Sequence, residues 1–87
     1  MFVILTYDVS EKKVNKVRKA LKKYLTWTQN SVFEGEISDA ILQKCMLEIS
    51  GIIDKMSDSV YIYVIENSRN VKKSKIGIEK AFDETII

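Results

Sequence analysis

The chain has 87 residues, with 14 Lys and Arg against 12 Asp and Glu, one cysteine, and neither histidine nor proline. The absence of histidine excludes the commonest general base and zinc ligand, and one cysteine excludes disulfide frameworks and cysteine-cluster metal sites. Any catalysis by this chain must therefore use carboxylates, hydroxyls, lysines or a hard metal ion. A chain of this length forms one domain, 1–87, and its thin core favours association with a second copy. The cysteine usage predicts a reducing, cytoplasmic location.

The first half of the chain shows three patterns. The apolar run 1–7 is too short for a signal peptide or a membrane span and predicts a strand buried on both faces. Apolar positions at steps of three and four predict a helix over about 10–25, capped by Ser10. Alternation over 26–37 predicts strands that reverse near Asn30 and Ser31.

The second half begins with a helix expected over about 38–57, in which Gly51 allows a kink or an early end. Residues 60–65 are β-branched and aromatic and predict a strong strand. A polar turn at 67–70 and a lysine-bearing edge strand over 71–78 follow.

This order predicts a ferredoxin-like βαββαβ fold of the α+β class, with both helices on one face of the sheet. The other face would carry large residues such as Trp27 and Phe33, or Tyr61 and Tyr63. Because that face would expose a large apolar patch, we expect a symmetric homodimer to cover it.

The net charge of +2 conceals a strong asymmetry. Residues 10–24 carry seven basic side chains and one acidic one, a net +6, whereas 34–58 carry a net −4. Four lysines, at steps of four, three and four, share one face of the first helix: Lys12, Lys16, Lys19 and Lys23. Such a row can neutralise phosphates without reading sequence. A solvated helix face is the alternative, and the scarcity of acidic partners in this helix gives the two interpretations equal weight.

Asp8 ends the first predicted strand, at the edge where ligands gather in open sheets, and is a candidate ligand for a hard metal ion. The alternative is a carboxylate that stabilises the start of the following helix. One carboxylate is few for phosphodiester chemistry, and a dimer that brings two Asp8 side chains together would supply a second. Ser31 contacts phosphate or shapes a turn, Tyr7 packs or donates a hydrogen bond, and Cys45 is expected to be a small buried hydrophobe.

Several segments together resemble the CRISPR-associated Cas-two family over nearly the whole chain. They are VILTYDV at 3–9, the lysine-rich helix, QNSVFEGE at 29–36, YIYV at 61–64 and KIGI at 75–78. Where many members carry arginines, this chain offers Lys12 or Lys13 in the first helix and Trp27-Thr28 before Gln29. The resemblance implies a ferredoxin-like homodimer packed through its sheet faces. It also implies an extra C-terminal strand, in which the tail (about 79–87) packs on the partner subunit.

The resemblance further implies that Asp8 of each subunit faces a shared cleft and binds a divalent cation, usually Mg²⁺. Family members are described as metal-dependent nucleases acting on RNA or double-stranded DNA, and also as scaffolds that bridge Cas-one integrase dimers. We therefore expect a CRISPR adaptation protein of antiviral defence with Asp8 as its catalytic and metal-binding residue. The alternative is a non-catalytic scaffold on the incoming DNA, and a third possibility is a regulatory domain for a small ligand.

The residues expected to serve this function form two sets. The nucleic-acid-binding set is Lys12, Lys13, Lys16, Arg18, Lys19, Lys23 and Ser31, and the set supporting Asp8 is Tyr7, Gln29 and Phe33. Because the chain has no histidine to accept a proton near neutral pH, we expect a cleavage rate that rises with pH.

Overall fold

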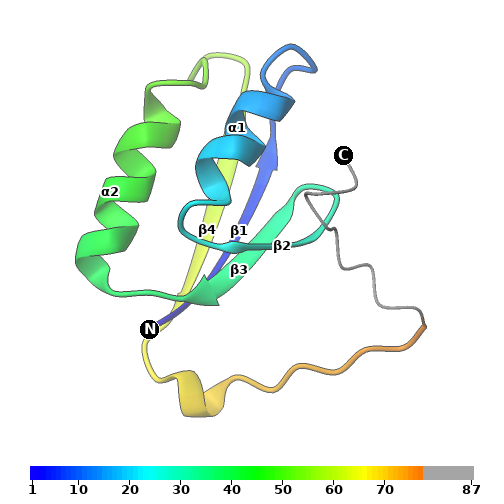
Figure 1. Cartoon of the computed structure of the whole chain (residues 1–87), viewed down its shortest axis with the longest axis vertical. Helices are drawn as coiled ribbons and strands as arrows, with labels where there is room; N and C mark the ends of the chain where they lie inside the picture. The colour runs from blue at the N-terminus through cyan, green and yellow to red at the C-terminus, as the bar shows by residue number, and fades with distance from the viewer. Residues whose placement is uncertain (78–87) are drawn as a thin grey trace.

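The computed structural model describes residues 1–77 and has the predicted βαββαβ order (Figure 1). The elements are β1 (Phe2–Asp8), α1 (Val14–Leu21), β2 (Thr26–Gln29), β3 (Val32–Glu36), α2 (Asp39–Ser50), β4 (Ser59–Ile65) and the short 3₁₀ turn η1 (Ser68–Asn70). None of the helices in this part of the chain is long and apolar enough to cross a membrane.

The four strands form one sheet in the order β2-β3-β1-β4, with every neighbouring pair antiparallel. The central strand β1 pairs on one side with β3, where Leu5 lies opposite Phe33, and on the other side with β4, where Leu5 lies opposite Ile62. Both helices cover the same face of this sheet, as Figure 1 shows. The ferredoxin-like arrangement is therefore the one that the sequence predicts.

The core lies between the helices and the covered face of the sheet. Along β1 the buried residues alternate with partly exposed ones, so that Val3, Leu5 and Tyr7 point towards the helices. Phe33 is fully buried in the same layer. The opposite face, which we call the open face, carries Tyr61 and Tyr63, whose exposed fractions are 61% and 56%. Of the two candidate sets for this face, the tyrosines lie there, and Phe33 belongs to the core.

The first helix is shorter than the predicted 10–25. Its N-cap position is taken by Lys13 with no side-chain capping bond, so the prediction that Ser10 caps it is wrong. Ser10 acts through its backbone instead, since its carbonyl accepts the Lys13 amide at 2.9 Å and its own amide donates to Asp58 at 3.0 Å. Residues 10–13, which the periodicity assigns to the helix, instead lie in the turn that follows β1.

The second helix begins as expected, because the Ser38 side chain accepts a hydrogen bond from the Ile41 amide at 3.3 Å. It ends at Ser50 with Gly51 as its C-cap, and so realises the early end that Gly51 allows; the bound at 57 is wrong. Beyond Gly51 the chain turns, and the Asp58 amide bonds the Asp54 carbonyl at 2.7 Å. That turn delivers the chain to β4.

The segment after β4 departs from the prediction. Residues 71–77 form no strand, so the edge strand predicted over 71–78 is wrong for the residues described. The lysines that interrupt the apolar pattern leave no continuous row to pack on the sheet. Lys73 forms an ion pair with Glu34 of β3 instead. Residue 78, the tail at about 79–87 and the expected extra C-terminal strand lie outside the described residues.

Candidate nucleic-acid interface and metal site

Asp8 is the last residue of β1 and lies opposite Ser59 at the start of β4. It is exposed and follows buried Tyr7, so the alternation of the strand places it on the open face. Its carboxylate has no hydrogen-bond or ion-pair partner within residues 1–77. It does not cap α1, which begins at Val14 without a side-chain cap. The carboxylate is therefore available to a ligand.

The donor set at Asp8 fits one kind of metal site. Within residues 1–77, no three His, Cys, Asp or Glu side chains gather closely enough to hold an ion. A caged zinc or calcium site is therefore absent from this part of a single chain. Mg²⁺ is commonly held by only one or two carboxylates, with water and substrate phosphates completing its shell. A single Asp8 per copy fits that pattern.

The segment that follows Asp8 is anchored by a buried carboxylate, Asp58, which sequence reasoning treated only as a break between elements. Asp58 accepts hydrogen bonds from the Ser10 amide at 3.0 Å, the Asp54 amide at 2.8 Å and the Lys13 ammonium at 2.8 Å. The contacts with Ser10 and Lys13 hold the β1–α1 turn against the start of β4, and the contact with Asp54 closes the turn before β4, so the backbone is fixed on both sides of the Asp8–Ser59 pair.

The same contacts set the charge of Asp58. The Asp54 amide, the Lys13 ammonium and the Ser10 amide lower the pKa of this carboxyl below its ordinary value, against the opposing effect of burial. Lys13, predicted to bind nucleic acid, is thus engaged within the fold. No pattern in the sequence marks this pair, because its members lie 45 residues apart.

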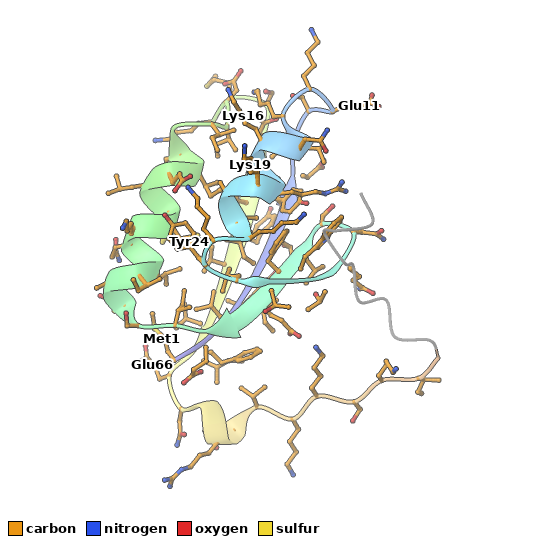
Figure 2. All side chains as sticks on the ribbon, in the orientation of Figure 1. Met1, Glu11, Lys16, Lys19, Tyr24 and Glu66 are labelled. Atoms are coloured by element: carbon orange, nitrogen blue, oxygen red, sulfur yellow. The ribbon has the colours of Figure 1, made fainter. Side chains whose placement is uncertain are left out.

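Three lysines of the predicted row remain exposed and without an ion-pair partner in residues 1–77, namely Lys12, Lys16 and Lys19. Figure 2 shows Lys16 and Lys19 along α1, with Tyr24 beyond its last turn. Lys23 is different, because it forms an ion pair with Glu48 of α2, which also accepts a hydrogen bond from the Tyr24 hydroxyl at 2.7 Å. We call Lys12, Lys16 and Lys19 the lysine row from here on.

Two residues of the lysine row, Lys16 and Lys19, and Asp8 lie on opposite sides of the sheet. These two lysines belong to α1 on the covered face, whereas Asp8 lies at the end of the open face. Only the β1–α1 turn, which carries Lys12, connects the two surfaces directly. In one copy, a nucleic acid that contacts both must therefore pass around this end of the sheet.

Tyr7 and Phe33, which were predicted to support the site, meet in an aromatic cluster beside α1. Trp27 stacks on Phe33 with ring centres 6.1 Å apart and an 8° angle between the planes, and Tyr7 lies 6.2 Å from Phe33. Arg18 joins them, since its guanidinium carbon lies 4.5 Å from the centre of the Trp27 ring and its Nε–H donates to the Tyr7 hydroxyl at 3.3 Å. We call Tyr7, Arg18, Trp27 and Phe33 the Trp27 cluster.

The cluster also holds the β2–β3 hairpin. The Trp27 indole N–H and the Tyr7 hydroxyl both donate to the Asn30 carbonyl, at 2.8 and 3.3 Å. Asn30 has a φ of 33°, in the left-handed region that asparagine tolerates, and this confirms the predicted tight reversal. The Ser31 carbonyl accepts the Tyr7 amide at 3.1 Å, so the backbone of Ser31 joins the hairpin to β1, while its side chain is half-exposed.

Gln29, the remaining predicted supporting residue, lies on β2, which β3 separates from the strand that ends at Asp8. It is exposed at the end of β2, where a bulge follows Trp27, and it borders a hollow of about 750 Å³. This hollow lies between the open face, at Ile4, Val32 and Glu34, and residues 73–77.

A four-stranded antiparallel sheet with two helices on one face, a lysine-rich first helix and an exposed aspartate at the end of β1 together define a small ferredoxin-like protein with a basic first helix. Comparison with known proteins supplies the family. The family model described as "CRISPR associated protein Cas2" matches residues 1–73, and the chain belongs to this family.

Two named relatives match this chain in sequence over nearly its whole length. "CRISPR-associated endoribonuclease Cas2 3" of Thermodesulfovibrio yellowstonii is 55% identical over 86 residues, covering 99% of this chain and 98% of that protein. "CRISPR-associated endoribonuclease Cas2" of Thermotoga maritima is 46% identical over 83 residues, or 95% of each chain.

Solved structures show the same fold. One described as "Crystal structure of cas2" has a TM-score of 0.82 and 44% identity, covering 100% of this chain and 98% of the other. Streptococcus pyogenes Cas2 has a TM-score of 0.71 and 31% identity over 86% of this chain and all of that one. The resemblance seen in the sequence is confirmed.

Proposed function

We propose that the chain is a nucleic-acid-binding protein of CRISPR adaptation that acts as a homodimer and cleaves RNA or double-stranded DNA by Mg²⁺-dependent phosphodiester hydrolysis. The observation that carries this proposal is Asp8, an exposed carboxylate without a partner in residues 1–77, at the end of the central strand. The name endoribonuclease on a relative 55% identical to this chain supports the reaction class.

The homodimer is supported by the open face. Tyr61 and Tyr63 are more than half exposed there, next to Ile4 and Thr6 of β1. An apolar face of this kind is typical of an interaction surface, and a two-fold axis would present the same patch from both copies. Since Asp8 lies at the end of that face, an axis near this end would bring two Asp8 carboxylates into one site.

The residues of the chain divide the work of the proposed reaction. Asp8 supplies carboxylate oxygens for the ion, and the lysine row holds the phosphate backbone by charge rather than by sequence. The bound cation would supply Lewis-acid polarisation of the phosphate and activation of water. Because the chain has no histidine to accept the water's proton near neutral pH, the rate should rise from pH 6 to pH 9.

The test is cleavage of labelled RNA and labelled duplex DNA with Mg²⁺ or with a chelator, by the wild type beside Asp8→Asn and Asp8→Ala. We expect cleavage by the wild type with Mg²⁺ alone, and none by either variant. Asp8→Asn keeps the shape of the side chain, so its loss of activity reports the carboxylate charge. Activity that survives in both variants, or in the presence of chelator, would contradict the proposal.

The second candidate function is a non-catalytic scaffold that binds DNA together with the Cas-one integrase. The observation in its favour is the separation of Lys16 and Lys19 from Asp8, because lysines on the opposite side of the sheet can hold DNA without any metal site. As a scaffold, Asp8→Ala would leave spacer acquisition intact in cells. Charge reversal at Lys16 and Lys19 would abolish it. The nuclease hypothesis instead requires that Asp8→Ala remove the cleavage activity.

A further inference from the structure

Arg18 differs from the lysine row because its side chain is held in place. The central carbon of its guanidinium lies 4.5 Å from the centre of the Trp27 ring, within the range of a cation–π contact. Its Nε–H donates to the Tyr7 hydroxyl at 3.3 Å. Tyr7 is itself 6% exposed, and its hydroxyl donates a hydrogen bond to the Asn30 carbonyl at 3.3 Å. A buried hydroxyl and a neighbouring ring therefore orient this cation.

The contacts that hold Arg18 do not involve the two Nη atoms of its guanidinium. Only Nε is used by the Tyr7 hydroxyl, and neither Nη atom has a hydrogen-bond or ion-pair partner within residues 1–77. Arg18 is half-exposed, so those N–H groups are open to a ligand. The planar fork of a guanidinium matches the paired oxygens of a phosphate group, which a lysine can meet only as a point charge.

A second cation meets the same ring. The Lys22 ammonium lies 4.9 Å from the centre of Trp27, one helical turn after Arg18. Two cationic side chains are therefore gathered on this side of the helix, each within 5 Å of the centre of one ring.

We propose that Arg18, seated on Trp27 and aimed by Tyr7, binds a phosphodiester group of the nucleic-acid backbone. Lys16 and Lys19 of the lysine row lie on the exposed face of α1, and Arg18 lies on the side of the helix that contacts Trp27 of β2, so the contact extends the basic surface towards the β2–β3 hairpin. Tyr7 is a positioning residue, because it acts through Arg18. The proposal rests on the proposed function only in taking nucleic acid as the ligand, and it does not require cleavage.

The expected loss of affinity follows from how firmly the Arg18 side chain is held before a ligand binds. A side chain already fixed by two contacts loses little rotamer freedom when it binds, unlike a lysine that extends into solvent. Removing such a charge-assisted, two-pronged contact should weaken binding about tenfold. Because the contact is to phosphate, the loss should be the same for different sequences.

The experiment measures binding in chelator, so that cleavage plays no part. Labelled duplex DNA and labelled RNA are titrated by fluorescence anisotropy over a series of salt concentrations. The proteins are the wild type, Arg18→Gln, Arg18→Lys and Tyr7→Phe. The control is Lys44→Gln, which removes one exposed positive charge from α2. Circular dichroism and thermal unfolding confirm that each variant is folded.

Arg18→Gln should weaken binding about tenfold and reduce the slope of log Kd against log salt by about 0.9 on duplex DNA. Arg18→Lys keeps the charge and should still lose affinity, since it loses the fork. Tyr7→Phe should lose less, and Lys44→Gln should bind as the wild type does. Trp27 is the only tryptophan, so its fluorescence should change on binding in the wild type and change less in Arg18→Lys.

Each contrary outcome has a distinct meaning. If Arg18→Lys binds as tightly as the wild type, Arg18 acts only as a point charge and the proposed fork is wrong. If Arg18→Gln and Lys44→Gln lose equal affinity, the effect is one of net charge and the proposal fails. Should Arg18→Gln not fold, Arg18→Lys decides alone. A wild type that binds but does not cleave refutes the nuclease function and leaves this contact standing, whereas a wild type that binds no nucleic acid refutes both.

Discussion

Phe33 contacts both Trp27 and Tyr7 in the Trp27 cluster, and replacing it tests how much these ring contacts stabilise the fold. Its side chain is fully buried, and its ring contacts Trp27 at 6.1 Å and Tyr7 at 6.2 Å between centres. Phe33→Leu keeps most of the buried apolar area but loses both ring pairs, each worth about 0.5–1.5 kcal/mol. We therefore expect a loss of roughly 1–3 kcal/mol in the free energy of unfolding. Phe33→Ala also opens a cavity and should lose about 3–5 kcal/mol.

These losses are large for a chain of this size. A stability of about 0.05–0.15 kcal/mol per residue gives an 87-residue domain roughly 4–13 kcal/mol. Phe33→Leu should fold, with a Tm lower by about 4–8 °C for each kcal/mol lost. Phe33→Ala should leave little margin.

The assay is urea and thermal unfolding followed by far-ultraviolet circular dichroism, with Trp27 fluorescence recorded in the folded state. Ile49→Ala is the control, because Ile49 is buried on α2 and outside the Trp27 cluster. It should destabilise by about 2–5 kcal/mol and leave the folded-state fluorescence unchanged. The reasoning is refuted if Phe33→Leu changes neither the unfolding midpoint nor the fluorescence of Trp27.

Three further predictions concern single side chains. Because contacts lower the pKa of Asp58 in the folded chain, its stabilising effect is complete above the ordinary carboxyl pKa and is lost as the pH falls below about 4. The urea midpoint should therefore fall between pH 7 and pH 3 more steeply in the wild type than in Asp58→Asn, and parallel curves would count against this. Asp8→Asn should shift the unfolding free energy by less than about 0.5 kcal/mol, since the exposed carboxylate has no partner in residues 1–77, and a larger loss in thermal unfolding would mean that Asp8 supports the fold. Burial, then the nearby Glu48 charge, raises the pKa of the Cys45 thiol to about 11, so folded protein should resist iodoacetamide at pH 8 and react once unfolded in urea; equal rates would contradict its burial.

The accuracy of the sequence predictions followed the range of the interactions involved. The hairpin at Asn30, the start of the second helix near residue 38 and the strand ending at Ile65 were predicted because each depends on neighbouring residues. The bounds of α1 were wrong because the apolar periodicity continues into turns that only the packing interrupts. The edge strand was wrong over 71–77 because strand formation needs a partner edge, which local propensity does not supply.

The residues of the candidate site follow the same rule, since local patterns predict some of them and distant contacts decide the others. Asp8 could be selected from its place at the end of an apolar strand, and the lysine row from its spacing. The engagement of Lys13 by Asp58 and of Lys23 by Glu48 could not be predicted, because these pairs join residues 45 and 25 positions apart. Tyr7 and Phe33 were named as supporting residues. Arg18 bonds Tyr7 directly and contacts Phe33 through Trp27, and both links form only when α1 packs beside β2.

The sequence by itself determined the order of the elements, the basic character of α1 and the family, because all three are written in local patterns of apolar and charged residues. Only the tertiary structure decided which face of the sheet each side chain occupies. A period of two separates Phe33 from its neighbours but does not say which set meets the helices. The packing of two helices on one face buried Phe33 and left Tyr61 and Tyr63 outside. It also placed Asp8 on the side of the sheet opposite to the helix that carries Lys16 and Lys19.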